Sequence, residues 1–466
     1  GCRDLRHESQ WLHRWGARGG DSPQAATLSP KPLRRRKIIA WLLTVLCVSA
    51  CADGPEQSSD AAPSLKLAIV GQALIEHDPR AYLEAPLQSV APILDEADVV
   101  FTNLEVAIAG PACACEPTRT DVFFHGAEPG VLDYLRDLGV SLLSLANNHA
   151  WDYGTEGVSS TIAEATARGF THSGTGVSVS AAVAPAYVTV GGLTLSLVSA
   201  ASVNSPEGAR ATEDRPGVNM LDPTSSTDWD RNLASVRTAR GQSDIVIVYQ
   251  HFQTDAEDGW QETWARAAID AGADIYVSHG EPTLSGVEVY EGGLILYGLG
   301  NFIFHTKTEL GRYTPDVWES VIAEVLLDER GAIEVTFTPV VLDRGSEGPL
   351  FFETRGYPEV AEGEAGEFIL ARLIELSVPY GTALELVDGT AMLGINPDAP
   401  DRVVWQIITY LDSLTPNPSD VDLAGTAATG RHLFLGKGNC ASCHMVNGKG
   451  GRRGPDLSRV GERRDP

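Results

Sequence analysis

The sequence predicts a mixed α/β fold for most of the chain, followed by the start of a small all-α domain. Two observations indicate the α/β class: short apolar runs alternate with helical stretches between residues 64 and 345, and polar residues gather just after the apolar runs. A third observation, a Cys-x-x-Cys-His motif near the end of the chain, marks the second domain. At 466 residues, the chain is long enough for two to three domains.

The apolar runs predict buried strands, and the helical stretches between them predict covering helices. The strands are expected at residues 67–70, 99–101, 142–145, 193–198, 245–249, 275–277 and 294–297. The helices are expected at residues 129–138, 159–168 and 263–271. Residues 319–327 and 332–342 predict a hairpin with its turn at 328–331. This alternation predicts a mixed sheet with helices on its faces.

Composition divides the rest of the chain. Residues 52–63 are rich in Ser, Asp, Ala and Pro, which predicts a flexible tether. An amphipathic helix is expected at 362–376, at the end of the α/β domain. A further helix, which carries Trp and Tyr, is expected at 403–414 and is followed by a linker. The expected parts are a leader and signal peptide at 1–51, the tether at 52–63, the α/β domain at 64–345, its C-terminal extension at 346–395, the helix and linker at 396–425, and an incomplete haem domain at 426–466.

The N-terminal region predicts export. Four basic residues at 34–37 precede an uncharged run at 38–50, which is too short for a membrane span of about 20 residues and is typical of a secretory signal. Val48-Ser49-Ala50-Cys51 resembles a bacterial lipobox, which implies a lipid anchor on Cys51 at the periplasmic side of a bacterial membrane. Ordinary cleavage without a lipid is the alternative. Residues before the basic run are interpreted as an over-translated leader.

The motif at residues 440–444 predicts a covalent c-type haem. Cys440 and Cys443 would form the thioether bonds, and His444 would be an axial ligand of the iron. A zinc half-site or a disulfide pair is the alternative, but a single half-site lacks the second ligand pair that zinc needs. Gly454-Pro455-Asp456-Leu457 resembles a loop of class I cytochromes c, where the Pro carbonyl accepts a hydrogen bond from the ligating His.

That resemblance implies an electron carrier with a periplasmic redox partner, in which Pro455 orients His444. Such cytochromes usually take a Met as the sixth ligand, and we expect this ligand beyond Pro466.

Of the 7 cysteines, Cys113 and Cys115 are expected to bind neither haem nor lipid. Their spacing favours neither a disulfide nor a zinc site, and we expect a loop pair with no catalytic role. The net charge of −27 argues against nucleic acid as a partner.

Polar residues follow five of the predicted strands, at 102–105, 146–154, 251–252, 278–280 and 298–302. A single His at a strand end is usually structural. Several imidazole, amide and carboxylate groups at one sheet edge are better explained by a divalent metal, which needs roughly three to six O or N ligands.

These segments resemble the CapA family of capsule and poly-γ-glutamate biosynthesis proteins. The resemblance covers most of residues 64–345 and is carried by Asn103-Leu104-Glu105, 145–149, Asp152-Tyr153-Gly154, His251, 271–274 and 297–302. It implies a metallophosphoesterase-like αββα sandwich that acts on an envelope polymer or phosphoester. It further implies His149 as general acid and a divalent metal (Mn, Fe or Zn) bound by Asn103, Glu105, Asn148, His251 and His279.

The sequence departs from the family pattern at two places. The family usually has Gly-Asp after its first strand, with the Asp on the metal, and here the pair is Gly71-Gln72. The nearby side chains of Glu76, His77 or Asp78 are candidate substitutes. The family's Gly-His-His-Pro-His run appears as residues 278–283, with one imidazole, His279, left. Two hypotheses therefore stay open: a metal-dependent hydrolase with an appended haem, and a periplasmic electron-transfer protein whose α/β domain only binds.

Overall fold

A computed structural model describes residues 64–83, 87–203, 206–253, 259–345, 348–395, 445–446 and 449–450. The chain divides into two compact units, and nearly all described residues belong to the first, which reaches Ile395. In the second unit, β22 (Met445–Val446) pairs antiparallel with β23 (Lys449–Gly450). The predicted signal peptide, tether, linker helix and haem-binding residues lie outside the described residues.

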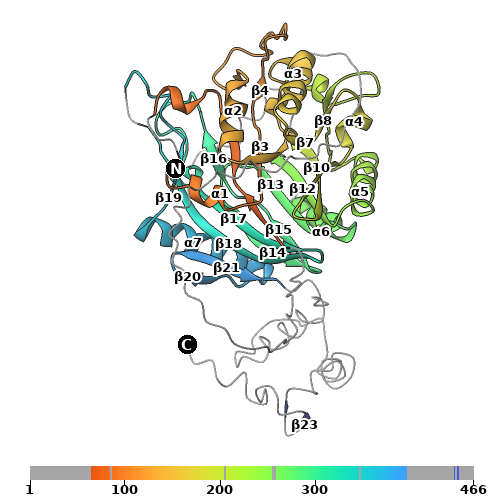
Figure 1. Ribbon diagram of the computed structural model, residues 1–466, viewed down its shortest axis with the longest axis vertical. Coiled ribbons are helices and arrows are strands. Elements are labelled where there is room, and N and C mark those ends of the chain that lie inside the picture. The colour runs from red at the N-terminus through yellow and green to blue at the C-terminus, as the bar shows by residue number, and fades with distance from the viewer. Residues whose placement is uncertain are drawn as a thin grey trace, which may run out of the picture. The chain divides into compact units, whose positions relative to one another are not determined.

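The first unit contains a mixed nine-stranded sheet and a six-stranded sheet (Figure 1). The first runs in the order β20 (Glu385–Val387), β21 (Thr390–Gly394), β18 (Gly331–Leu342), β17 (Glu319–Asp328), β1 (Leu65–Ile69), β3 (Val99–Asn103), β6 (Val140–Ser144) and β7 (Thr171–Ser173), and β19 (Pro358–Val360) pairs with β18. The second runs β14 (Val287–Tyr290), β15 (Gly293–Leu296), β13 (Ile275–Gly280), β12 (Ile245–Gln253), β10 (Leu193–Val203) and β9 (Ala186–Val190).

Short pairs connect the loops around these sheets. They are β2 (Gln72–Leu74) with β16 (Asn301–Phe304), β4 (Ala107–Ile108) with β5 (Gly126–Ala127), and β8 (Thr175–Gly176) with β11 (Gly217–Val218). The α-helices are α1 (Ala91–Asp95), α2 (Gly130–Asp137), α3 (Gly154–Ala167), α4 (Val179–Val183), α5 (Ser226–Arg240), α6 (Trp260–Asp270) and α7 (Gly363–Ser377). Short 3₁₀ turns cover 79–81, 149–151, 207–209, 315–318 and 378–380.

The two sheets share one apolar core, because alternate strand residues of both point into it. Leu67 and Phe101 come from the first sheet, and Ile247 and Val277 come from the second. All four side chains are fully buried. Ile369, Leu370 and Leu373 of α7 belong to the same cluster. The opposite faces of β1, β3 and β6 form a second core with α1 and α2, and α5 and α6 contact the second sheet (Figure 1).

The structure confirms the predicted α/β class and the order of its elements. Each of the seven predicted strands and three helices has a counterpart within a few residues, and the hairpin is β17–β18. The helix α5 was not predicted, because the side chains it buries include Asp228, Asn232 and Ser235 and so give no apolar period. None of the helices in the described ranges is both long and apolar enough to cross a membrane.

Candidate active site

The C-terminal ends of β3, β6, β12 and β13 bring most of the predicted site residues together. Asn103 is the last residue of β3, and the loop after β6 carries residues 147–149. His251 and His279 are register partners on the parallel strands β12 and β13. Parallel strands present their carboxyl ends at one edge, which is why residues far apart in sequence meet here.

Glu105 and His251 lie at the centre of this edge. Glu105 Oε1 is 3.5 Å from His251 Nε2, and the Tyr249 hydroxyl is 3.2 Å from His251 Nδ1. Burial raises the pKa of Glu105 to about 7, with the charges of His149 and Asp152 acting in opposite directions. Burial also holds the pKa of His251 well below its ordinary value, so this imidazole is neutral at pH 7.

Several buried ligand-type atoms at this edge have no hydrogen-bond partner among the described residues. They are Glu105 Oε2, Asn148 Oδ1, His251 Nε2 and both ring nitrogens of His279. Unpaired buried polar atoms are costly, and carboxylate oxygen, amide oxygen and imidazole nitrogen are donors for divalent metals. The donor chemistry therefore fits a metal ion. Within the described ranges, however, no three or more His, Cys, Asp or Glu side chains are arranged to hold one.

Asn103 differs from these four, because its amide is engaged. Its Oδ1 accepts a 3.1 Å hydrogen bond from Asn147 Nδ2, and its Nδ2 lies 3.5 Å from His251 Nδ1. Asn147 also donates to the Leu104 carbonyl at 2.7 Å, and its Oδ1 accepts the His149 backbone N–H at 3.0 Å. The structure thus places Asn103 beside the site as a link between His251 and the loop that carries His149.

Gln72, which stands where the family has an Asp, is a buried crosslink. Its Oε1 accepts the Gly280 N–H and its Nε2 donates to Asn301 Oδ1, both at 2.9 Å. Gly71 is needed beside it, since a Cβ there would lie 2.5 Å from the Gly300 carbonyl oxygen. Both polar side-chain atoms of Gln72 form hydrogen bonds within the fold. Gln72 therefore has no unpaired oxygen for a metal ion, in contrast to Glu105 and Asn148.

The three side chains considered as substitutes for that Asp are engaged elsewhere. Glu76 forms ion pairs with His125 and Lys307. The ring of His77 stacks on His305 with centroids 4.0 Å apart. Asp78 caps a 3₁₀ turn and pairs with Arg80.

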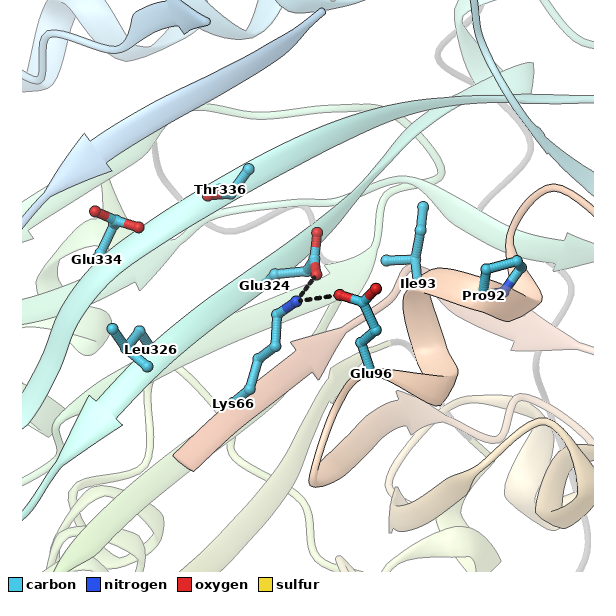
Figure 2. A pocket seen from close by; sticks show the side chains of 8 residues that line it. All are labelled: Lys66, Pro92, Ile93, Glu96, Glu324, Leu326, Glu334 and Thr336. Atoms are coloured by element: carbon cyan, nitrogen blue, oxygen red, sulfur yellow. Dashed lines mark hydrogen bonds and ion pairs between the residues drawn. The ribbon is translucent and has the colours of Figure 1, made fainter. Parts of the chain in front are cut away.

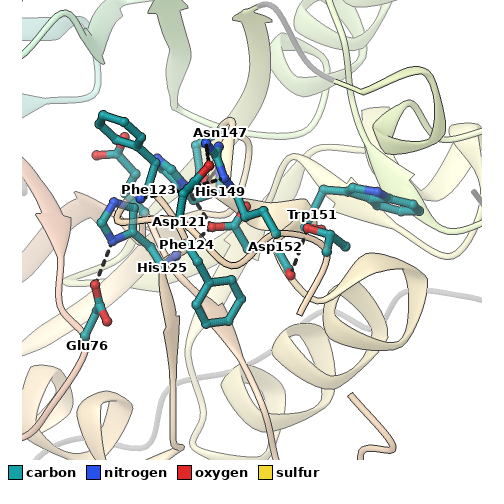
Figure 3. A network of polar contacts seen from close by, with 12 residues as sticks. Glu76, Asp121, Phe123, Phe124, His125, Asn147, His149, Trp151 and Asp152 are labelled. Atoms are coloured by element: carbon teal, nitrogen blue, oxygen red, sulfur yellow. Dashed lines mark hydrogen bonds and ion pairs between the residues drawn. The ribbon is translucent and has the colours of Figure 1, made fainter. Parts of the chain in front are cut away.

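His149 is held by Asp152. Its Nδ1 donates to Asp152 Oδ2 at 2.9 Å, and the same oxygen accepts the His125 backbone N–H at 2.7 Å (Figure 3). Burial alone would lower the pKa of His149, but the charges of Asp152 and Glu105 and the hydrogen bond to Asp152 raise it above its ordinary value. An imidazolium in this position has the properties of a general acid.

Sequence reasoning missed His125, which lies beside His149 with the two ring centroids 4.4 Å apart. It sits in a Phe-Phe-His-Gly stretch that matches no chemical motif, so only its spatial neighbours identify it. Cys113 and Cys115, expected as a loop pair, form a disulfide.

A surface cavity of about 450 Å³ lies elsewhere, over β1, β17, β18 and α1 (Figure 2). Lys66 spans it, with Nζ 2.6 Å from Glu324 and 3.2 Å from Glu96. None of the predicted site residues lines it. We interpret these ion pairs as structural, because they tie α1 to the sheet.

The fold and the site define an α/β protein with an imidazole- and carboxylate-lined centre at the strand ends of two packed sheets. The chain belongs to the family described as bacterial capsule synthesis protein PGA_cap, whose model matches residues 66–306. The predicted CapA resemblance is thereby confirmed. A cytochrome c family model matches residues 427–466, as expected from the Cys-x-x-Cys-His motif.

Three relatives support the family assignment. The chain is 32% identical over 268 residues to the PGA biosynthesis protein CapA of Bacillus subtilis and 28% identical over 272 residues to the capsule biosynthesis protein CapA of Bacillus anthracis. Each alignment covers 56% of this chain, and they cover 66% and 62% of the two relatives. A probable polyglutamine synthesis accessory protein of Mycobacterium tuberculosis is 32% identical over 213 residues, 44% of this chain and 55% of its own.

The match thus spans less than two thirds of the length of these relatives. Among solved structures, a hypothetical protein from Thermus thermophilus matches with 16% identity and a TM-score of 0.34, over 64% of this chain and 99% of that one. This last likeness carries no argument about function.

Proposed function

We propose that this chain is an exported, lipid-anchored accessory protein of capsule or polyglutamate synthesis. Its α/β domain would be a metal-dependent hydrolase of the metallophosphoesterase type, acting on an envelope polymer or phosphoester. Its C-terminal segment would carry a c-type haem that exchanges electrons with a periplasmic redox partner. The capsule and polyglutamate role is supported by the family match and by the names of the relatives.

One observation supports the hydrolase assignment most directly. Several buried atoms that could bind a metal have no hydrogen-bond partner among the described residues, and they belong to the same strand-end site as His149, which Asp152 orients. Glu105, Asn148, His251 and His279 are the residues that would hold a divalent ion. Such an ion, when bound, supplies Lewis acidity and a water of lowered pKa. The chain itself supplies His149, oriented through Nδ1 by Asp152, as the group that protonates a leaving oxygen.

A second candidate is favoured by Gln72. Because this amide crosslinks Gly280 and Asn301, the domain has one metal-binding carboxylate fewer than the family pattern. The α/β domain would then bind an envelope polymer without cleaving it, and electron transfer by the haem segment would be the activity of the protein.

The haem and the anchor are supported by sequence. The cytochrome c match covers Cys440, Cys443, His444 and Pro455, the residues proposed to attach, ligate and orient the haem. Cys51 is the proposed lipidation site, and radioactive palmitate labelling that is lost in Cys51→Ala would test it. Ordinary cleavage without a lipid would leave both proteins unlabelled.

Hydrolysis of bis(p-nitrophenyl) phosphate with added Mn²⁺ separates the two candidates. The hydrolase predicts turnover by the full-length holoprotein that is lost in His149→Ala and in Glu105→Gln. His172→Asn is a matched control, since His172 lies on β7, the last strand of the first sheet, and contacts Thr166 of α3 instead of a site residue. Absence of turnover by the wild-type protein would favour the binding scaffold.

A further inference from the structure

The disulfide between Cys113 and Cys115 lies in the loop between β4 and β5 and has no part in the strand-end site. A single residue, Ala114, separates the two cysteines. A disulfide stabilises a protein mainly by restricting the unfolded chain, and this contribution is smallest for the shortest loops. Stabilisation of the fold therefore gives this crosslink little reason to exist.

The two ends of the loop segment are held by contacts that do not need the disulfide. At the first end, the Gly110 N–H donates to Ser160 Oγ, and the Cys113 N–H donates to the Gly110 carbonyl, both at 2.9 Å. At the second end, the N–H and the hydroxyl of Thr118 donate to the Asp152 carbonyl at 2.8 and 3.0 Å. Because these hydrogen bonds involve neither sulfur atom, reduction of the disulfide would leave both anchor points in place.

The stretch between the two anchor points lies at the surface and is otherwise unattached. Residues 114–117 belong to no helix or strand, and none of them forms a hydrogen bond with another residue that the structure describes. Ala112, Ala114 and Glu116 are exposed, and the two cysteines between them are partly exposed. Exposed disulfides are reduced more readily than buried structural ones and are typically the labile or catalytic ones.

The spacing of the two cysteines determines which reductant can complete the reaction. Attack by a single thiol forms a mixed disulfide and releases the other cysteine, which stays on the far side of Ala114. Because the released thiolate remains so close, it can attack the mixed disulfide and expel the incoming thiol again. A reductant with a second thiol of its own can instead resolve the mixed disulfide. The dithiols of redox proteins are biological reagents of this kind.

We propose that Cys113–Cys115 is a thiol–disulfide exchange site whose reaction partner is a polypeptide dithiol. Three observations support it: the crosslink spans one residue, the loop is anchored at Gly110 and Thr118 without it, and the stretch between these anchors is exposed. The site goes beyond the proposed function and does not depend on the hydrolase activity.

The reaction balances with the dithiol as the only co-reactant. A thiolate of the partner attacks one sulfur of the pair, so that a new S–S bond forms as the bond between Cys113 and Cys115 breaks. The released cysteine takes a proton. The partner's second thiolate then attacks the partner's own sulfur in the mixed disulfide, and the remaining cysteine leaves and takes a proton. Two electrons and two protons pass to the pair, and the partner becomes a disulfide.

Thioredoxin, a dithiol protein, is the probe for the first test. An excess of reduced thioredoxin is mixed with the folded full-length chain, the reaction is stopped with N-ethylmaleimide, and the peptide that carries Cys113 and Cys115 is analysed by mass spectrometry. We expect two maleimide adducts on this peptide. We also expect one more oxidised thioredoxin per chain than in the Cys113→Ser, Cys115→Ser variant, which corrects for every other thiol or haem reaction.

Reduced glutathione is the matched single-thiol reagent. At the same thiol concentration it should give about a tenth of these adducts or fewer. Equal reduction by glutathione and thioredoxin would contradict the requirement for a dithiol. Adducts that form only after urea is added would overturn the exchange site, because the crosslink would then be protected by the fold.

A second measurement follows the fold during the reaction. The thioredoxin-reduced chain should keep the circular dichroism spectrum and the cooperative thermal transition of the oxidised chain, and oxidised glutathione should restore the disulfide after thioredoxin is removed. Loss of the cooperative transition on reduction would identify the disulfide as a structural brace and would also overturn the proposal.

Discussion

Gln72 donates a 2.9 Å hydrogen bond to Asn301 Oδ1 and so ties β2 to β16 where the family pattern has a metal-binding Asp. The same side chain accepts the Gly280 N–H at the end of β13. A position expected to serve chemistry therefore serves the fold, and it joins elements that are 208 residues or more apart in sequence.

Gln72→Ala is expected to destabilise the domain by about 2–4 kcal/mol, because it leaves the Gly280 N–H and the Asn301 side-chain carbonyl oxygen unsatisfied in a buried place. Urea unfolding followed by fluorescence measures the change. Gln242→Ala is the matched control, since Gln242 is an exposed amide, and it should change the free energy of unfolding by less than about 0.5 kcal/mol. Equal effects of the two substitutions would argue against the crosslink.

The buried carboxyl of Glu105 predicts a pH dependence of stability in the metal-free protein. Its folded-state pKa of about 7 lies above the ordinary value of 4.5, so the folded state binds more protons between these pH values. Stability contributed by this group is present below pH 4.5 and is lost as pH rises toward 7.

Relative to Glu105→Gln, wild type should lose roughly 3 kcal/mol of unfolding free energy over that range. Thermal unfolding of both proteins in a pH series, with chelator present, measures this difference. If the difference in unfolding free energy between the two proteins stayed constant over this pH range, burial would not raise the pKa of Glu105 in the folded state.

The Cys113–Cys115 disulfide is expected to add little stability, since it closes a very short loop. Replacing both residues by Ser should lower the free energy of unfolding by about 1–2 kcal/mol. The neighbouring Thr118 N–H donates to the Asp152 carbonyl at 2.8 Å, and this contact should keep the loop in place. Calorimetry measures the change, and a loss above about 4 kcal/mol would contradict this view.

Covalent haem attachment gives a prediction for the C-terminal segment. Replacing Cys440 and Cys443 by Ser should abolish the haem band that survives denaturing electrophoresis of the exported protein. The Cys113→Ser, Cys115→Ser variant serves as the control and should keep the band. A band unchanged by loss of Cys440 and Cys443 would contradict thioether attachment.

Much of the fold could be predicted from sequence, because the strands of a two-sheet core are short apolar runs that stand out between polar stretches. Leu67, Ile247 and Val277 lie in such runs, and all three are buried in the shared core. The helix α5 could not be predicted in this way, because the residues it buries include Asp228 and Asn232. These side chains form hydrogen bonds, so the buried side of α5 shows no apolar period in the sequence.

The candidate site was predictable only where chemistry coincided with a strand end. Glu105, His251 and His279 satisfy that condition. His125 follows no long strand, and its relation to His149 depends on Asp152 and Glu76, which reach it from different loops. Occupation of both Gln72 amide atoms is likewise a tertiary property that one sequence does not reveal.

Titration calorimetry with Mn²⁺ at about pH 7.5, on metal-free wild type and on the Glu105→Gln, His251→Gln double variant, tests the proposed centre most directly. Wild type should bind one Mn²⁺ per chain and the double variant none, while His172→Asn should match wild type. Equal Mn²⁺ binding by wild type and the double variant, or no binding by either, would contradict a metal centre at Glu105 and His251.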